Sequence, residues 1–299
     1  MSSSPVSSSA QAAAPLHANL LALGAIALWA SLAALGVQLG EVPPFLLTGI
    51  GLLIGSVPSW HRWREWRVAP RTLALGVYGL FCYHFLLFVA LRLAPPVEAN
   101  LVNYLWPLFI VVLAPCLLVG VVLRPVHLVA AGVGFAGAAL AILGGREAGM
   151  AGNADGRAVW GFAAALGSAF IWATYSLATR RLSDRAQGFP TAAIGLFGLV
   201  SGLLSLLCHA LLEPRVALGA REGLFLLAMG LGPLGAAFYL WDAALKRGDP
   251  RTIGVLSYLT PLGSTLCLVA TTGRAFSASL LAAALMITAA AAMAARAGR

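Results

Sequence analysis

Long apolar stretches, which follow one another along almost the whole chain, constrain the fold more than any other feature. The 299 residues contain ten stretches of about 17–25 mostly apolar residues, the length that an α-helix needs to cross a bilayer. Only 10% of the residues are charged, against about a quarter in soluble domains. The sequence therefore predicts an all-α polytopic membrane protein. The ten expected spans are Ala18–Leu39, Pro44–Trp60, Thr72–Leu93, Glu98–Val119, Val126–Leu143, Val159–Thr179, Thr191–Leu212, Gly223–Leu245, Thr252–Thr272 and Phe276–Ala295.

One motif occurs twice inside these stretches, at matching places in the two halves of the chain. The fourth span contains Asn103-Tyr104-Leu105-Trp106-Pro107, and the ninth contains Ser257-Tyr258-Leu259-Thr260-Pro261. Polar groups and a helix-breaking Pro are tolerated at membrane depth only where protein or a water-filled cavity surrounds them. The motif therefore predicts an internal duplication whose working centre lies near the middle of the membrane, as in a transporter.

Further matches extend this repeat. Gly24–Ser31 in the first span resembles Gly167–Thr174 in the sixth, so that Trp29 corresponds to Trp172. Five spans in each half is an odd number, so the second half enters the membrane upside down relative to the first. We expect ten transmembrane helices as two inverted five-helix repeats around a central cavity. The expected division is a disordered cytoplasmic tail (1–17), a first repeat (18–147), a linker (148–158) and a second repeat (159–299).

The basic residues predict how the bundle is oriented. Of the 19 Lys and Arg residues, 13 fall on the side that holds both termini and six on the other side. Positive charge marks the cytoplasmic face, so both termini are expected in the cytoplasm. The net charge of +9 agrees with this bias and with contact with anionic membrane lipid. Because the arginines are scattered over short loops, no nucleic-acid partner is expected. Met1–Pro15 contains no basic residue and so lacks the start of a signal peptide.

With ten spans in two halves, the chain resembles the drug/metabolite transporter superfamily, whose members contain EamA-like repeats. The string from Asn103 to Pro107 is similar to that of the bacterial aromatic amino-acid exporter branch. The resemblance implies a secondary transporter of the bacterial inner membrane. It would export Phe, Tyr, Trp and other neutral amino acids through a cavity lined by spans three, four, six, eight and nine. The chain departs from its own repeat at Thr260, which stands where the first half has Trp106, so the halves are expected to contribute unequally to the cavity.

Polar and aromatic side chains well inside the spans are the candidate substrate contacts. Residues at i, i+3, i+4 and i+7 share one face of a helix, and this spacing joins Asn100 to Pro107 in span four. A hydrated cavity would supply the partners that Tyr hydroxyls and indole N–H groups need, and aromatic walls suit aromatic cargo. The expected substrate-binding residues are Tyr78, Tyr83, His84, Asn100, Asn103, Tyr104, Trp106, Trp172, Tyr175, Tyr239, Ser257 and Tyr258, with helix kinks at Pro107 and Pro261.

Ionisable groups are few inside the spans. Asp242 and Lys246 are spaced i, i+4 near the cytoplasmic end of span eight, which favours a structural ion pair over proton coupling. His84 is the best single candidate for a proton carrier, but a buried His packed by its neighbours is the favoured interpretation. The four Cys residues lie in apolar spans without close pairing, so neither a disulfide nor a metal site is expected, and no cofactor is implied. Facilitated export is favoured, and the oligomeric state is left open.

Two other functions lead to different expectations. A carrier of sugar phosphates or nucleotide sugars would need Arg or Lys inside the bundle, whereas all 19 basic residues can be placed in loops or at span ends. An intramembrane enzyme would need an activated nucleophile, paired carboxylates or metal ligands. No H-E-x-x-H sequence occurs, and Ser31 and Ser168 have no plausible base nearby. The sequence thus favours a transporter of neutral metabolites over an enzyme.

Overall fold

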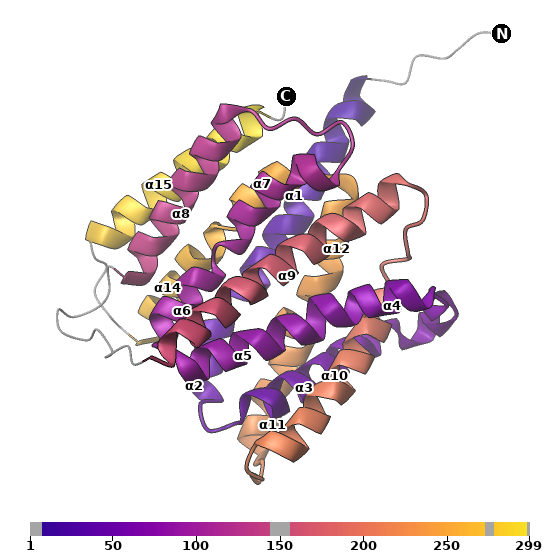
Figure 1. The fold of residues 1–299 in the computed structure, drawn as a ribbon, viewed down its shortest axis with the longest axis vertical. Helices are drawn as coiled ribbons and strands as arrows, with labels where there is room; N and C mark the ends of the chain where they lie inside the picture. The colour runs from indigo at the N-terminus through magenta and orange to yellow at the C-terminus, as the bar shows by residue number, and fades with distance from the viewer. Residues whose placement is uncertain (1–7, 144–155, 273–277, 298–299) are drawn as a thin grey trace.

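The structure is a computed structural model, and it describes residues 8–143, 156–272 and 278–297. Within these residues every regular element is a helix, and each expected span is a helical segment (Figure 1). Six of these segments are long and apolar enough to cross a membrane, and two more are shorter apolar helices. The prediction of a ten-span all-α protein is confirmed.

The first half contains five spans. The first is formed by α1 (Ser8–Ala30) and α2 (Leu32–Gln38), and the second by α3 (Pro44–Ser56). A 3-10 helix, η1 (Val57–Trp66), leads to the third span, which consists of α4 (Pro70–Val77), the π-helix η2 (Tyr78–Cys82) and α5 (Tyr83–Leu93). The fourth span is α6 (Pro96–Asn103) and α7 (Trp106–Leu117), and the fifth is α8 (Pro125–Leu143).

The second half follows the same order. Spans six and seven are α9 (Ala158–Asp184) and α10 (Ala193–Leu212). Span eight consists of α11 (Ala220–Leu231), the π-helix η3 (Gly232–Ala236) and α12 (Ala237–Arg247). Span nine is α13 (Pro250–Leu256) and α14 (Leu259–Thr272), and span ten is α15 (Ala278–Ala297).

Several boundaries differ from the expected ones. The first helix already begins at Ser8, inside the stretch expected as a disordered tail, while residues 1–7 and 144–155 lie outside the described part of the chain. At its other end, α9 continues past Thr179 to Asp184. An i, i+4 ion pair of 2.8 Å between Arg180 and Asp184 supports this last turn.

Matching interruptions mark the two halves as repeats of each other. A π-helix lies in the third span of each half, and the fourth span of each half is broken at its motif, between α6 and α7 and between α13 and α14. Pro107 and Pro261 follow these breaks, and neither has an N–H to donate to the carbonyl four residues before it. The motif prolines thus interrupt both helices in the middle of the bundle.

The two halves pack through reciprocal helix pairs. The second spans contact each other (α3 with α10), as do the fifth spans (α8 with α15), and α1 on α12 is matched by α9 on α5 (Figure 1). Glycine allows α3 and α10 to approach closely, because a Cβ added to Gly202 would lie 3.0 Å from the carbonyl oxygen of Gly49. The start of α1 and the end of α15 lie at the same end of the molecule (Figure 1). We call this side of the bundle the terminal side.

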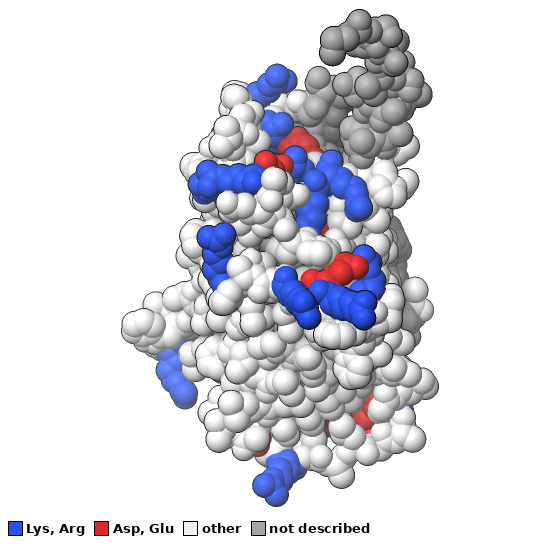
Figure 2. Space-filling model, turned by 90° about the vertical axis from the view of Figure 1, so that its right-hand side faces the viewer, with Lys and Arg blue, Asp and Glu red and all other residues white. Residues whose placement is uncertain are grey.

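Exposed aromatic and basic residues gather on the terminal side in η1. Trp60 and Trp63 are 50% and 56% exposed, and Arg62 and Arg64 lie between and beside them. On the face drawn in Figure 2, Lys and Arg concentrate in the upper and middle parts, and the surface below is largely uncharged. Tryptophan with arginine is typical of the membrane–water interface.

Candidate functional site

A cavity of about 230 Å³ lies between the two halves. One water needs roughly 10–15 Å³ on this measure, so the cavity has room for a small organic molecule. Thr48, Phe88 and Asn100 lie within about two turns of the helix ends opposite the terminal side, so the cavity occupies that half of the bundle. Its lining residues are Trp29, Leu32, Leu47, Thr48, Tyr83, His84, Leu87, Phe88, Asn100, Asn103, Tyr104, Trp106, Trp172, Leu234, Phe238 and Thr260.

A cluster of four tryptophans (Trp29, Trp106, Trp172 and Trp241), called here the tryptophan cluster, separates the cavity from the terminal side. The Trp172 ring centroid lies 5.7 Å from that of Trp29, 6.4 Å from that of Trp106 and 6.2 Å from that of Trp241. Two of the four indole N–H groups have acceptors within the protein. Trp29 donates to the Pro233 carbonyl and Trp241 to the Ser176 hydroxyl, both at 3.1 Å. The cluster therefore forms a closely packed floor of the cavity, and these hydrogen bonds fix two of its four rings.

A short hydrogen-bond chain crosses the cavity wall from α9 to α5. The Ser168 hydroxyl donates to Asn103 Oδ1 at 2.8 Å, and Asn103 Nδ2 donates to Tyr83 Oη at 3.2 Å. These bonds fix the orientation of the buried Asn103 amide. Because the Tyr83 oxygen accepts from Asn103, its own proton is left to donate to another group.

His84 presents an acceptor to the cavity. Its Nδ1 lies 2.5 Å from the carbonyl oxygen of Leu80, which can only accept, so Nδ1 carries the hydrogen. In the neutral ring, Nε2 is then left with a lone pair. No charged side chain lines the cavity within the described chain, so its polar surface consists of neutral donors and acceptors.

Seven of the twelve expected substrate-binding residues line this cavity. They come from α5 (Tyr83 and His84), from the broken fourth span (Asn100, Asn103, Tyr104 and Trp106) and from α9 (Trp172). The fourth-span residues lie on both sides of the break between α6 and α7, so the break borders the cavity.

The other five expected residues lie outside the cavity lining. Three hydroxyls have other partners: Tyr78 Oη lies 2.8 Å from Thr174 Oγ1, Tyr239 donates to the Gly55 carbonyl at 3.1 Å, and Ser257 donates to the Ile253 carbonyl at 2.9 Å. Tyr175 packs behind Trp172, over Gly79, and Tyr258 packs over Gly134 beside Phe135. Glycine leaves the space that each of these two rings fills.

Nine lining residues were not expected from the sequence. Trp29 could have been found, because the repeat aligns it with Trp172, and Thr260 because it occupies the motif position of Trp106. Of the other seven, Thr48 is polar, and the remaining six are apolar residues that no motif distinguishes from ordinary packing residues. The seven are Leu32, Leu47, Thr48, Leu87, Phe88, Leu234 and Phe238.

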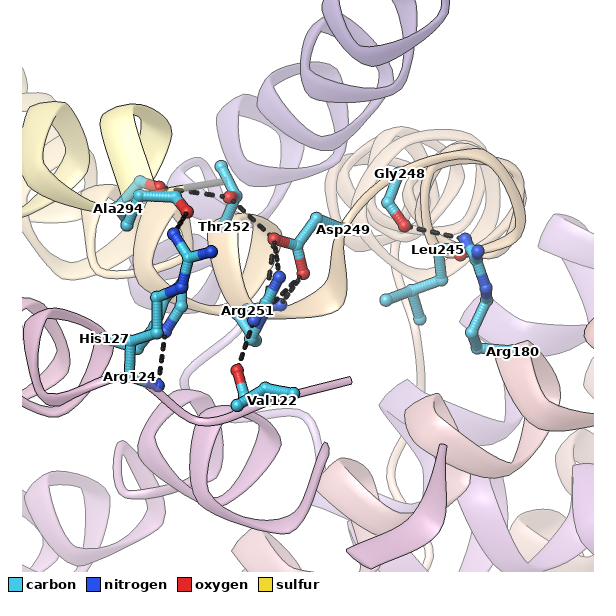
Figure 3. Close-up of polar contacts among 11 residues, drawn as sticks. Val122, Arg124, His127, Arg180, Leu245, Gly248, Asp249, Arg251, Thr252 and Ala294 are labelled. Carbon is cyan, nitrogen blue, oxygen red and sulfur yellow. Dashed lines mark hydrogen bonds and ion pairs between the residues drawn. The ribbon is translucent and has the colours of Figure 1, made fainter. Parts of the chain in front are cut away.

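The terminal side is closed by polar contacts between helix ends (Figure 3). Arg180, on α9, donates to the carbonyl oxygens of Leu245 at 3.0 Å and Gly248 at 2.7 Å, at the end of α12. On the other side of the same turn, Arg251 pairs with Asp249 and donates to the Val122 carbonyl, which follows α7. These arginines tie the turn between α12 and α13 to both halves of the protein.

A buried ion pair lies between this closure and the tryptophan cluster. Lys246 Nζ is 2.6 Å from Asp242 Oδ2, as the i, i+4 spacing predicts, and Thr191 donates to the same oxygen at 2.7 Å. Lys246 also donates to the carbonyl of Phe189 and lies 4.0 Å from the centroid of its ring. Asp242 is 2% exposed, so its charge depends on these partners.

Comparison with known proteins identifies the architecture. The model of the EamA-like transporter family matches residues 16–143 and again residues 159–296. The chain belongs to the EamA-like transporter family. The two matches fall on the two five-helix halves, as the resemblance predicted, and membership of a transporter family agrees with the prediction that the chain is not an enzyme.

Two similar proteins cover nearly the full length of this EamA-like transporter. One is the aromatic amino acid exporter YddG of Ancylobacter novellus, which is 42% identical over 284 residues, 93% of this chain and 96% of the relative. The other is a protein of known crystal structure, which is 40% identical with a TM-score of 0.86, over 94% of this chain and 98% of the other. The ten-helix EamA-like fold therefore extends over nearly the whole chain. The exact domain boundaries drawn from the sequence stay a prediction.

Proposed function

We propose that this protein exports aromatic and other large neutral amino acids across the bacterial inner membrane by alternating access. The observation that carries the proposal is the composition of the cavity: aromatic walls, hydroxyl donors, one neutral imidazole acceptor and no charged lining residue among those described. A net neutral zwitterion with a large ring matches such a lining, and rings in contact add about 0.5–1.5 kcal/mol each. The 42% identity to an aromatic amino acid exporter supports the same substrate class.

The arrangement also supports a direction of transport. Most of the basic residues belong to the terminal side, so we infer that this side is cytoplasmic and that the cavity faces the outside of the cell. For substrate to enter from the cytoplasm, the tryptophan cluster and the arginine contacts must separate while the opposite ends of the helices close. Reciprocal packing of inverted halves allows this exchange, because each half can take the position of the other.

Exchange in proteoliposomes tests the function. Vesicles loaded with unlabelled phenylalanine are expected to accumulate labelled phenylalanine by counterflow, with half-saturation near millimolar, since a carrier must also release its cargo. A pH gradient is expected to leave the rate unchanged if export is facilitative. Accumulation of a labelled sugar phosphate, with none of phenylalanine, would replace the proposal by an anion carrier.

Loosening the terminal-side contacts is expected to change which side is open. In Arg180→Gln, the side chain loses its two bonds to the α12 carbonyls, so the terminal side should open more often. A cysteine placed at Thr179, which is 1% exposed, should then react at least about five-fold faster with a maleimide applied from that side. Arg185→Gln, at the exposed end of the same helix, is the control. Equal labelling rates in the Arg180→Gln and Arg185→Gln variants would contradict the proposal that Arg180 holds the terminal side closed.

A further inference from the structure

Thr260 marks a chemical difference between the two repeats inside the cavity. It occupies the motif position that Trp106 holds in the first half, and both residues line the cavity. Thr260 is 5% exposed, and its hydroxyl oxygen is buried without a hydrogen-bond partner in the described part of the protein. A buried hydroxyl without a partner is unfavourable, which points to a group that the protein itself does not supply.

Two other threonines of the bundle donate their hydroxyl protons to carbonyl oxygens of the same helix. Thr265, one turn further along α14, donates to the Pro261 carbonyl at 2.9 Å, and Thr179 donates to the Ser176 carbonyl at 2.8 Å. Thr260 follows the helix break, where the nearby Ser257 carbonyl accepts the backbone N–H of Thr260 at 3.0 Å. The Thr260 hydroxyl thus has no partner among the described residues, and rotation about its Cα–Cβ bond can turn it toward the cavity that the side chain lines.

The position of Thr260 favours an anionic partner. It lies in the first turn of α14, a helix of 14 residues, where the helix dipole is positive. The lone pair of His84 suits an ammonium group instead, because Nδ1 of that ring donates to Leu80. The cavity therefore offers an acceptor for an ammonium group at His84 on α5, and a hydroxyl donor in a positive helix field at the start of α14.

We propose that the Thr260 hydroxyl donates a hydrogen bond to the main-chain carboxylate of the transported amino acid. This inference rests on the proposed function and adds the residue that recognises the substrate as an amino acid. The two repeats then have different roles in binding. At this motif position the first half presents the Trp106 ring to the substrate side chain, and the second half presents Thr260 to the carboxylate.

Two variants that differ in the hydroxyl group test this role. Thr260→Val removes the hydroxyl and keeps the shape, whereas Thr260→Ser keeps the hydroxyl. In phenylalanine counterflow at equal membrane levels, Thr260→Val is expected to raise the half-saturation concentration about ten-fold or more, and Thr260→Ser to change it less than about three-fold. Equal losses in Val and Ser variants, or no loss in either, would overturn the proposal. If the Val variant does not insert, Thr260→Ala serves in its place.

A substrate analogue separates this inference from the proposed function. Phenylalaninamide keeps the ring and the ammonium group but lacks the carboxylate. Phenylalanine should compete better than the amide in the parent protein, and Thr260→Val should reduce that preference about ten-fold. An unchanged preference in the variant would overturn the role of Thr260 while leaving amino-acid export intact. A parent protein that transports no phenylalanine would overturn the proposed function and this inference together.

Discussion

Trp172→Ala is expected to abolish export of aromatic amino acids while the protein still inserts into the membrane. The ring is 3% exposed and contacts six other aromatic rings, including three from the first half of the chain: Trp29, Tyr83 and Trp106. Its removal takes away a cavity wall and leaves a void between the cavity and the terminal side. Replacing a buried tryptophan by alanine lowers the stability of the fold by about 3–5 kcal/mol, so the remaining rings of the tryptophan cluster should also lose their fixed positions.

The measurement is phenylalanine counterflow at matched protein levels, where a loss of at least about ten-fold is expected from the missing ring contacts. Trp160→Ala is the matched control, because Trp160 lies on the same helix and is 72% exposed. Trp172→Phe should keep part of the activity. If Trp172→Ala transports phenylalanine at the rate of the parent protein, the tryptophan cluster is not part of the transport path.

Lys246→Met is expected to be the most destabilising single change in the terminal half of the bundle. It removes the ammonium group that pairs with Asp242 at 2.6 Å and leaves a carboxylate that is 2% exposed without its cation. Breaking a buried pair in this way costs about 3–5 kcal/mol, because the remaining charge is neither solvated nor compensated. The melting temperature of the detergent-solubilised protein and its recovery as a single species measure the effect.

A second substitution should reverse most of this loss. In the double variant Asp242→Asn with Lys246→Met no buried charge is left unpaired, so its melting temperature should lie well above that of Lys246→Met alone. Arg247→Met, one residue further along on the exposed face of α12, should leave the melting temperature nearly unchanged. If the double variant is no more stable than Lys246→Met, the pair stabilises the fold by packing and not through charge.

Much of the fold follows from the sequence because membrane insertion leaves few alternatives. Apolar length determines the spans, and the two Pro-containing motifs mark the breaks between α6 and α7 and between α13 and α14. The π-helix η2 could not be predicted, since the Tyr78–Cys82 segment contains no Pro and its geometry depends on the helices packed against it.

The candidate site was harder to predict, because periodicity shows which residues share a face but not which neighbour that face meets. Tyr104 and Tyr258 hold the same place in their motifs, yet only Tyr104 lines the cavity. In this conformation the cavity occupies one side of the membrane, so residues equivalent by the repeat have different surroundings. The space above Gly134, filled by the Tyr258 ring, has no signature in a single sequence.

Substrate protection of a cavity cysteine tests most directly whether the space between the halves is the path of transport. Asn100→Cys is made in a variant without Cys82, Cys116, Cys208 and Cys267, with Val216→Cys, 38% exposed and outside the lining, as the control. We predict that an impermeant maleimide reaches Asn100→Cys from the side opposite the termini, and that phenylalanine slows this reaction but not that of Val216→Cys. Labelling of Asn100→Cys that phenylalanine leaves unchanged at concentrations saturating counterflow would contradict a transport path through this cavity.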